Sequence, residues 1–293
     1  MSLWLDLLGA SVRYVETPSF GNIRVVEAGM GKPEALFLMH GIGGHLEAYA
    51  KNVLALSADY HVVAFDFVGH GLSDKPLHID YLPATYARQL GELMDALGIM
   101  RAHISGESLG GWVAGTFAVM SPFRVKRLVL NTTGGIPIVS EKGRRDLQHL
   151  EELSRRNVGQ VPTIETVRSR MQWLMHESNW PLLDDELVGS RLAIYLRPDF
   201  QQAAPKVLAL LKSADSGAGA PMMIELGKLA CDTLFLWTRF NPIHDLEAAN
   251  AACAQVPGGQ LRVMRADAAH WPQYEAPAEF NSVVHQFLQT GKV

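Results

Sequence analysis

The strongest constraint on the fold comes from the segment I-S-G-E-S-L-G-G at 104–111, whose inner five residues form a G-x-S-x-G pattern. The run just before it, at 102–105, predicts a strand, and residues 109–120 predict a helix. Glycines on both sides of a serine permit a sharp strand-to-helix turn that exposes the hydroxyl as a nucleophile. We therefore predict that Ser108 is a catalytic nucleophile; the alternative is an ordinary turn serine.

The rest of the chain alternates short apolar runs with helical patterns, which is typical of a mostly parallel α/β sheet. The run A-L-F-L-M at 35–39 is apolar throughout and predicts a buried strand. The first two strands, at 12–15 and 23–27, are expected to pair antiparallel. Further strands are predicted at 61–66, 125–131, 233–237 and 261–264, and further helices at 45–56, 84–97 (with Gly98 as its cap) and 276–289.

The alternation stops at about residue 136 and resumes after 228. Helical stretches at 145–153 and 167–175 dominate this part, and a loop is predicted at 213–221. We predict an α/β core made of residues 1–135 and 229–293 with an inserted helical cap at 136–228. An apolar stripe in the cap either lines a pocket or packs the cap on the core, and we favour packing; it comprises Met171, Trp173, Leu174 and Met175.

Composition excludes several classes of protein. The chain of 293 residues has a formal net charge of -4 and no basic stripe, so nucleic acid is not an expected partner. Two cysteines, Cys231 and Cys253, cannot form a disulfide framework and suit a reducing compartment. The apolar N-terminus lacks a basic region and is interrupted by Asp6, and no segment has the length and purity of a membrane span. We expect a cytoplasmic protein without a membrane partner; a homodimer is compatible with these features.

The loop H-G-I-G-G at 40–44 follows a predicted strand. A nucleophilic serine at such a turn needs backbone N–H groups that hold the developing oxyanion, one after the nucleophile and one from this loop. We predict Leu109 and Ile42 as the donors, with Gly41 or Gly43 if the loop adopts another register. The alternative is a plain strand-to-helix connection.

A catalytic base is expected after the last strand, because the chain order in this kind of fold is serine, acid, histidine. The segment D-A-A-H-W-P-Q-Y-E at 267–275 supplies His270 at that place. A histidine that merely packs in its loop is the alternative.

These motifs, with D-F-V-G-H-G-L-S-D-K-P at 66–76, resemble the α/β-hydrolase superfamily. They are similar in particular to the meta-cleavage product hydrolases, which cut a carbon–carbon bond in ring-fission products of aromatic compounds. The resemblance implies that Trp271 lines the pocket and that Arg191 contacts a dienoate substrate. It implies no metal and no organic cofactor. The sequence departs from the family at Glu107, where an Asn is frequent, and in the loop at 40–49, which is closer to general α/β-hydrolases.

The acid position is the largest departure, because L-W-T-R-F-N-P at 236–242 places Asn241 where the family has Asp. An asparagine oxygen can orient a histidine but cannot stabilise imidazolium by charge. With Asn241 at the acid position, the chain is a weakened hydrolase, an enzyme whose slow step needs no charged residue beside the histidine, or a sequence altered at position 241. The alternative is that Asn241 only shapes the turn before Pro242. Four other residues were considered for the role of the acid, and none is a clear replacement. They are Asp232, Asp245, Asp267 and Asn131.

We therefore predict a serine-dependent hydrolase for a small-molecule substrate, a 2-hydroxy-6-oxo-dienoate whose carbon–carbon bond is cleaved. A carboxylesterase or lactonase is the first alternative. A cofactor-free oxygenase and a ligand-binding protein with an incomplete triad are alternatives from other classes.

Overall fold

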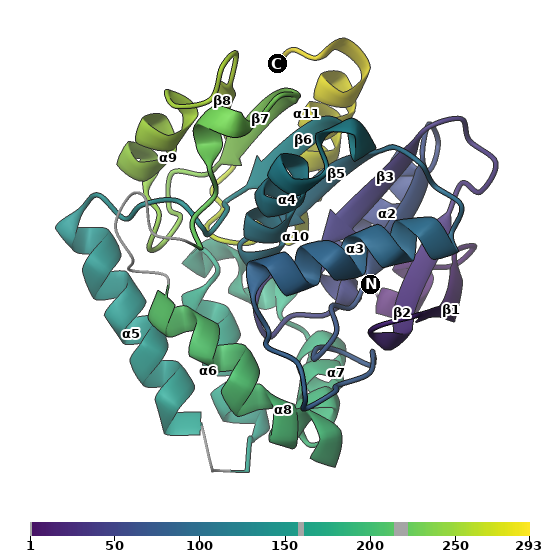
Figure 1. Cartoon of the computed structure of the whole chain (residues 1–293). Helices are drawn as coiled ribbons and strands as arrows, with labels where there is room; N and C mark the ends of the chain where they lie inside the picture. The colour runs from purple at the N-terminus through teal and green to yellow at the C-terminus, as the bar shows by residue number, and fades with distance from the viewer. Residues whose placement is uncertain (1, 158–160, 214–221) are drawn as a thin grey trace.

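A twisted sheet of eight strands forms the centre of the molecule (Figure 1), which is described here from a computed structural model for residues 2–157, 161–213 and 222–293. The strands follow the spatial order β1-β2-β4-β3-β5-β6-β7-β8. β2 pairs antiparallel with β1 and β4, and all other pairs are parallel. The strands are β1 (Ser11–Thr17), β2 (Gly21–Ala28), β3 (Ala35–Met39), β4 (His61–Phe65), β5 (Ala102–Glu107), β6 (Val125–Asn131), β7 (Asp232–Trp237) and β8 (Gln260–Val263).

The central strand β3 is apolar throughout because helices cover both faces of the sheet. Along β3, Phe37 and Met39 belong to one core cluster, whereas Leu36 and Leu38 belong to another on the opposite face. The first cluster contains side chains of α3, α4 and α9, and the second contains side chains of α2 and α11. The core helices are α1 (Leu3–Asp6), α2 (Ala50–Leu56), α3 (Pro83–Ala96), α4 (Leu109–Met120), α9 (Leu246–Cys253), α10 (Pro272–Glu275) and α11 (Pro277–Thr290).

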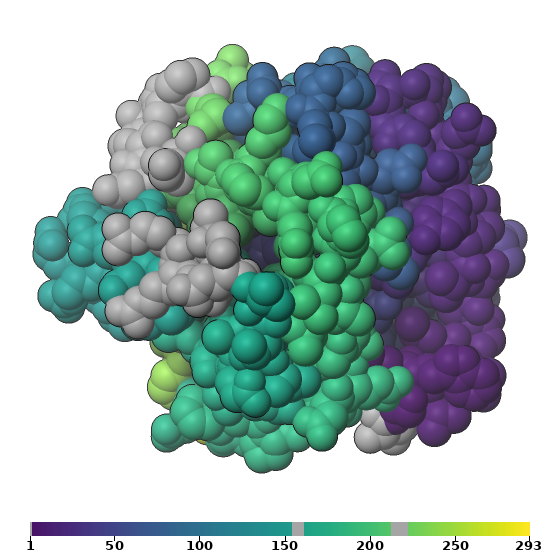
Figure 2. Space-filling model, turned by 90° about the horizontal axis from the view of Figure 1, so that it is seen from below, coloured from purple at the N-terminus to yellow at the C-terminus, as the bar shows by residue number. Residues whose placement is uncertain are grey.

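Between β6 and β7, the described part of the chain forms four further α-helices, which gather beyond the carboxyl ends of the parallel strands (Figure 1). They are α5 (Glu141–Asn157), α6 (Ile164–Trp173), α7 (Asp185–Tyr195) and α8 (Pro198–Leu208). Figure 2 shows the face that they form, with a recess between its teal and green parts. This arrangement suits the predicted cap at 136–228, whose boundaries remain a proposal. Apart from Ser213, the predicted loop at 213–221 lies outside the described residues.

The sequence predictions can be compared with these elements. All eight predicted strands are present, and the first two pair antiparallel as expected. β5 extends two residues beyond its predicted end, as far as Glu107. The apolar stripe of α6 packs as predicted, since Met171 and Met175 are buried in a cluster with α7 and Trp271, although Leu174 also lines a pocket. Within the described ranges, the helices are all too short or too polar to cross a membrane.

The turn between β5 and α4 is the most crowded part of the backbone. Ser108 has φ 55° and ψ -115°, a strained conformation that places it between the strand and the helix. A Cβ on Gly106 would lie 2.2 Å from the carbonyl carbon of Gly110. A Cβ on Gly110 would lie 2.1 Å from the Met39 carbonyl oxygen. Both glycines are therefore needed for α4 to approach β3 and β5 this closely.

We expect Gly106→Ala to destabilise the fold by about 2 kcal/mol or more, because its Cβ meets backbone atoms that cannot move independently. Gly189→Ala is the matched control: Gly189 lies within α7, and its Cβ would have no neighbour within 4 Å. This control should stabilise the protein by roughly 0.5–1 kcal/mol through the lower backbone entropy of alanine. Urea unfolding of both variants measures the difference; equal stabilities would contradict the role given to the turn.

Candidate active site

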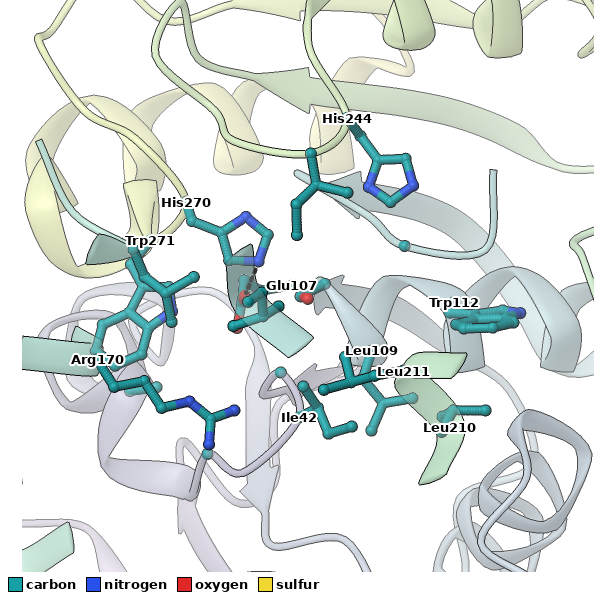
Figure 3. Close-up of a pocket in the computed structure, with 18 of the residues that line it drawn as sticks. Ile42, Glu107, Leu109, Trp112, Arg170, Leu210, Leu211, His244, His270 and Trp271 are labelled. Atoms are coloured by element: carbon teal, nitrogen blue, oxygen red, sulfur yellow. Dashed lines mark ion pairs between the residues drawn. The ribbon is translucent and has the colours of Figure 1, made fainter. Parts of the chain in front are cut away.

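A pocket between the cap and the carboxyl ends of the strands contains the residues singled out from the sequence (Figure 3). Ser108 lines it from the turn after β5, and His270 lines it from the loop after β8. Gly41 and Ile42 reach it from the loop after β3. Parallel strands bring their carboxyl ends to one edge of a sheet, so these distant segments converge there. Asn241, which follows β7, is buried behind His270.

His270 is held in place through its own backbone and that of its neighbours. Its N–H donates to the Leu174 carbonyl at 2.9 Å, and its carbonyl accepts from the Thr132 hydroxyl at 2.9 Å. The buried carboxylate of Glu275 accepts from the N–H groups of Ala269 and Trp271, at 2.9 and 3.1 Å. These contacts fix the residues on both sides of His270, so the imidazole has a defined position. The sequence around Glu275 gives no indication of this role.

The amide of Asn241 fixes the tautomer of His270. Its NH₂ group donates to the His244 carbonyl at 2.5 Å, and its Oδ1 lies 2.7 Å from Nδ1 of His270. Because a carbonyl only accepts, the NH₂ must face His244, and Oδ1 must then accept a proton carried by Nδ1. The other ring nitrogen, Nε2, is left with its lone pair. Asn241 thus shapes the turn after β7 and also orients His270.

The carboxylates considered as alternatives to Asn241 have other partners. Asp245 caps α9, as expected, by accepting from the N–H groups of Glu247 and Ala248 at 3.1 Å. Asp267 pairs with Arg239 at 2.9 Å, and Asp232 pairs with Arg127 at 3.1 Å. At the end of β6, the amide of Asn131 donates to the Gln273 side chain at 2.8 Å. The orienting group at Nδ1 of His270 is therefore neutral.

One carboxyl group does approach His270, on the opposite side of the ring from Asn241. Oε1 of Glu107 lies 3.2 Å from Nε2, and the side chains of both residues are almost fully buried (Figure 3). Burial raises the pKa of Glu107 to about 8, against opposing contributions from the Gly41 N–H and Arg191. Burial, together with nearby His244, lowers the pKa of His270 to about 3. Glu107 stands where the meta-cleavage product hydrolases frequently have Asn, but no sequence pattern predicts its contact with His270.

The predicted oxyanion loop lies beside Ser108. Ile42 and Leu109 both line the pocket, and Leu109 is the first residue of α4, where helical N–H groups point out of the helix (Figure 3). The N–H of Gly41 is directed at the Glu107 carboxyl group. Gly43 has φ 67°, and its carbonyl accepts from the Tyr195 hydroxyl of the cap at 2.7 Å. Of the residues considered, Ile42 and Leu109 remain the best placed donors.

The cap contributes two buried arginines to the pocket. Arg191 of α7 lies over the Trp271 ring, with 4.7 Å between its guanidinium carbon and the ring centroid. Its Nη2 is buried and has no hydrogen-bond partner among the described residues. Arg170 of α6 also lines the pocket, on the same side as Trp271 (Figure 3). The sequence did not predict that Arg170 lines the pocket, because it directly precedes Met171 in the apolar stripe that was expected to pack.

Arg191 is connected to the core by a chain of buried polar groups that the sequence did not reveal. Its Nε–H donates to Nε2 of His45 at 3.3 Å, and Nδ1 of His45 lies 2.6 Å from the Glu47 carboxylate. Glu47 accepts two hydrogen bonds from Arg24, which also pairs with Asp66 at 2.6 Å. At the end of this chain farthest from Arg191, Arg24 compensates the charges of Glu47 and Asp66. The chain fixes the position of Arg191, whose Nη2 has no partner among the described residues.

The opposite part of the pocket is apolar and contains the following side chains: Trp112, Leu147, Leu150, Leu210, Leu211 and Ile243. In Figure 3, Leu210, Leu211 and Trp112 lie on the other side of Glu107 from Arg170 and Trp271. Across the described ranges, no group of three or more His, Cys, Asp or Glu side chains could hold a metal ion. The site therefore combines a serine at a strained turn, a histidine of fixed tautomer, the start of a helix, a cationic end and an apolar end.

Comparisons with known proteins agree with this geometry. A 2-hydroxy-6-oxononadienedioate/2-hydroxy-6-oxononatrienedioate hydrolase of Paraburkholderia xenovorans is 30% identical over 288 residues, 94% of each chain. A 2-hydroxy-6-oxo-2,4-heptadienoate hydrolase of Pseudomonas putida is 28% identical, over 89% of this chain and 91% of its own.

The 2-hydroxy-6-oxo-6-phenylhexa-2,4-dienoate hydrolase of Rhodococcus sp. strain RHA1 has a similar structure, with a TM-score of 0.81 at 22% identity over 96% of this chain and all of its own. The model of the alpha/beta hydrolase fold family matches residues 34–277. This match covers most of the chain, including the turn at Ser108 and the loop that carries His270. The chain belongs to the alpha/beta hydrolase fold family.

Proposed function

We propose that this protein is a serine-dependent hydrolase that cleaves a carbon–carbon bond in a 2-hydroxy-6-oxo-dienoate, a ring-fission product of aromatic degradation. The observation that carries the proposal is the buried Arg191, which lines the same pocket as Ser108 and His270 and whose Nη2 has no hydrogen-bond partner among the described residues. A guanidinium in such a position suits a carboxylate, which every 2-hydroxy-6-oxo-dienoate carries at one end. The names of the Paraburkholderia and Pseudomonas relatives support the same class of substrate.

The first step that such a substrate requires is ketonisation, because the dienol has no good leaving group at the bond to be cleaved. A proton leaves the 2-hydroxyl group and a proton is added at C5, while the double bonds shift toward the new C2 ketone. His270 serves this transfer, since its Nε2 has a free lone pair and lies in the pocket. Arg191 and Trp271 hold the carboxylate end during the transfer.

Cleavage follows at the C6 carbonyl. Ser108, or a water molecule that it activates, adds to C6 while His270 takes the proton at Nε2. The carbonyl electron pair moves to oxygen, where the N–H groups of Ile42 and Leu109 stabilise the negative charge. The oxyanion then collapses, the C5–C6 bond breaks, and its electron pair is delocalised into the C2 ketone as a dienolate. If water was the nucleophile, the acyl fragment leaves directly as a carboxylic acid. If Ser108 was the nucleophile, the acyl group stays on Oγ until a water molecule, deprotonated by His270, adds to it and releases the acid and the serine hydroxyl.

A carboxylesterase or lactonase remains the second candidate, because the loop at 40–44 and the apolar end of the pocket would also accept a neutral ester. A cofactor-free oxygenase would use His270 as base without needing Ser108. A ligand-binding protein would need neither residue. A homodimer and a cytoplasmic location stay predictions from the sequence, to be tested by light scattering and by cell fractionation.

Ser108→Ala should remove nearly all hydrolysis and leave the fold intact, because Ser108 lies at the pocket and its Cβ is retained. We expect turnover of a yellow dienolate substrate, followed by absorbance, to fall by about 10³-fold or more. The urea unfolding curve should match that of the wild type. Retention of more than about a tenth of the turnover would exclude Ser108 as the nucleophile and favour the oxygenase or the ligand-binding protein.

Arg191→Ala should lower kcat/KM for a dienoate by about 10- to 100-fold, since a charge-assisted hydrogen bond to the carboxylate is lost. A neutral nitrophenyl ester should lose less than about threefold, because it makes no such bond. Arg191→Lys is the matched variant: it keeps the charge but not the planar fork, so its activity on the dienoate should be intermediate. Equal losses on both substrates would mean that Arg191 acts through the structure of the cap.

The division of the pocket also predicts which substituent C6 carries. With the carboxylate at Arg191 and Arg170, the C6 substituent points into the apolar end, where a second carboxylate would be buried without a partner. A phenyl or methyl substituent should therefore be preferred over a carboxylate-bearing chain by roughly tenfold or more in kcat/KM. Comparison of a heptadienoate with a nonadienedioate substrate measures this; a preference for the diacid would show that Arg170 binds a second carboxylate.

A further inference from the structure

The orienting group at Nδ1 of His270 is a neutral amide, so Asn241 provides a hydrogen bond but no negative charge to the imidazolium that forms when His270 takes a proton. In serine proteases, loss of this charge lowers turnover by about 10⁴-fold. Burial makes the deficit larger, because it already lowers the pKa of His270 to about 3. An active enzyme with this geometry needs a negative charge elsewhere near the ring.

Glu107 is the carboxyl group within reach. Its Oε1 lies 3.2 Å from Nε2 of His270, yet Oε1 forms no aligned hydrogen bond with any described residue. The two groups are therefore close together without forming an aligned hydrogen bond. A charge on Glu107 would act on Nε2 at this short range in a buried site.

The surroundings of Glu107 hold its carboxyl group at this place. A Cβ on Gly41 would lie only 2.7 and 2.8 Å from the two carboxyl oxygens, so a glycine is required beneath them. The N–H of Gly41 is directed at the carboxyl group and favours its ionised form. Glu107 is also the last residue of β5, which fixes its backbone immediately before the nucleophile.

We propose that Glu107 is a positioning residue that supplies, from the Nε2 side of His270, the negative charge that Asn241 does not supply from the Nδ1 side. The role of the usual acid is thereby divided: Asn241 fixes the tautomer, and Glu107 stabilises the imidazolium. The inference rests on the proposed function, since it takes Ser108 as nucleophile and His270 as base. In the reaction the Ser108 proton moves to Nε2, and the Oγ electron pair forms the new bond to the substrate.

The charge on Glu107 depends on pH, which gives the proposal a signature that a purely structural role lacks. The other groups that face the pair are Arg191 from α7, Tyr49 from the segment Leu46–Tyr49, and His244 beside His270. Burial raises the pKa of Glu107 to about 8, so the carboxyl group is mostly neutral at pH 6 and ionised at pH 9. Ionisation is the active form, so reactivity should rise as pH increases through this value.

The test follows the reaction of Ser108 with a neutral serine-reactive phosphonate, which needs His270 as base but neither Arg191 nor a dienoate. The wild type and Glu107→Gln should react at similar rates at pH 6, and the wild type should be faster by roughly 10- to 100-fold at pH 9. Glu107→Ala should show the same rates as Glu107→Gln at both pH values. This agreement would show that the effect comes from the lost carboxyl group and not from the introduced amide. A wild-type to Glu107→Gln ratio that stays constant between pH 6 and pH 9 would overturn the proposal.

Asn241→Asp provides the second arm, because it places a charge at Nδ1 whether or not Glu107 is ionised. At pH 9, Asn241→Asp should raise the rate of reaction with the phosphonate by about tenfold or more in the Glu107→Gln background. The gain in the wild-type background should be clearly smaller, because both residues act on the imidazole of His270. Equal gains in both backgrounds would refute the shared role. Ser108→Ala separates a failure of the proposed function from a failure of the role given to Glu107. If the phosphonate reacts with Ser108→Ala as fast as with the wild type, Ser108 is not the nucleophile and the proposed function fails, independently of Glu107.

Discussion

The site depends on the crowded turn at Ser108. Gly106 and Gly110 let α4 pack against the ends of β3 and β5 at a distance that no side chain allows. This packing keeps Ser108 at φ 55° and directs the first N–H groups of α4 toward the pocket. The start of the loop after β3 is brought to the same place, because the carbonyl groups of Met39 and His40 lie against Gly110 of α4. One close approach of backbone segments thus positions both Ser108 and the proposed N–H donors.

Around this turn, the molecule limits the number of charges that it buries. A carboxylate at Nδ1 of His270 would need compensation in a pocket where burial already favours neutral groups. Asn241 instead satisfies the ring and the His244 carbonyl with one uncharged amide. Glu107 adds a carboxyl group whose charge depends on pH, and Arg191 adds a cation fixed by His45. Electrostatic balance in the site is therefore distributed over the core and the cap.

The cap divides the pocket into two chemically different ends. α6 and α7 bring arginines to the side of Trp271, whereas leucines after α8 and in α5 form the apolar side. Under the proposed function, this division would orient an acidic, partly apolar molecule before any bond is made or broken, and so lower the entropic part of the barrier. The cap would then select which carbonyl group meets Ser108, whose position the core sets.

The sequence by itself determined the fold and brought forward the candidate site residues, because both leave local signals. Short apolar runs predicted all eight strands, G-E-S-L-G predicted the turn, and the place of His270 and Asn241 after the last strands predicted their neighbourhood. Only the tertiary structure decided that Glu107 approaches Nε2, that Arg170 joins Arg191, and that Glu275 anchors the histidine loop. Those contacts join segments far apart in the chain, and a side chain's partner across a pocket leaves no periodicity in either segment.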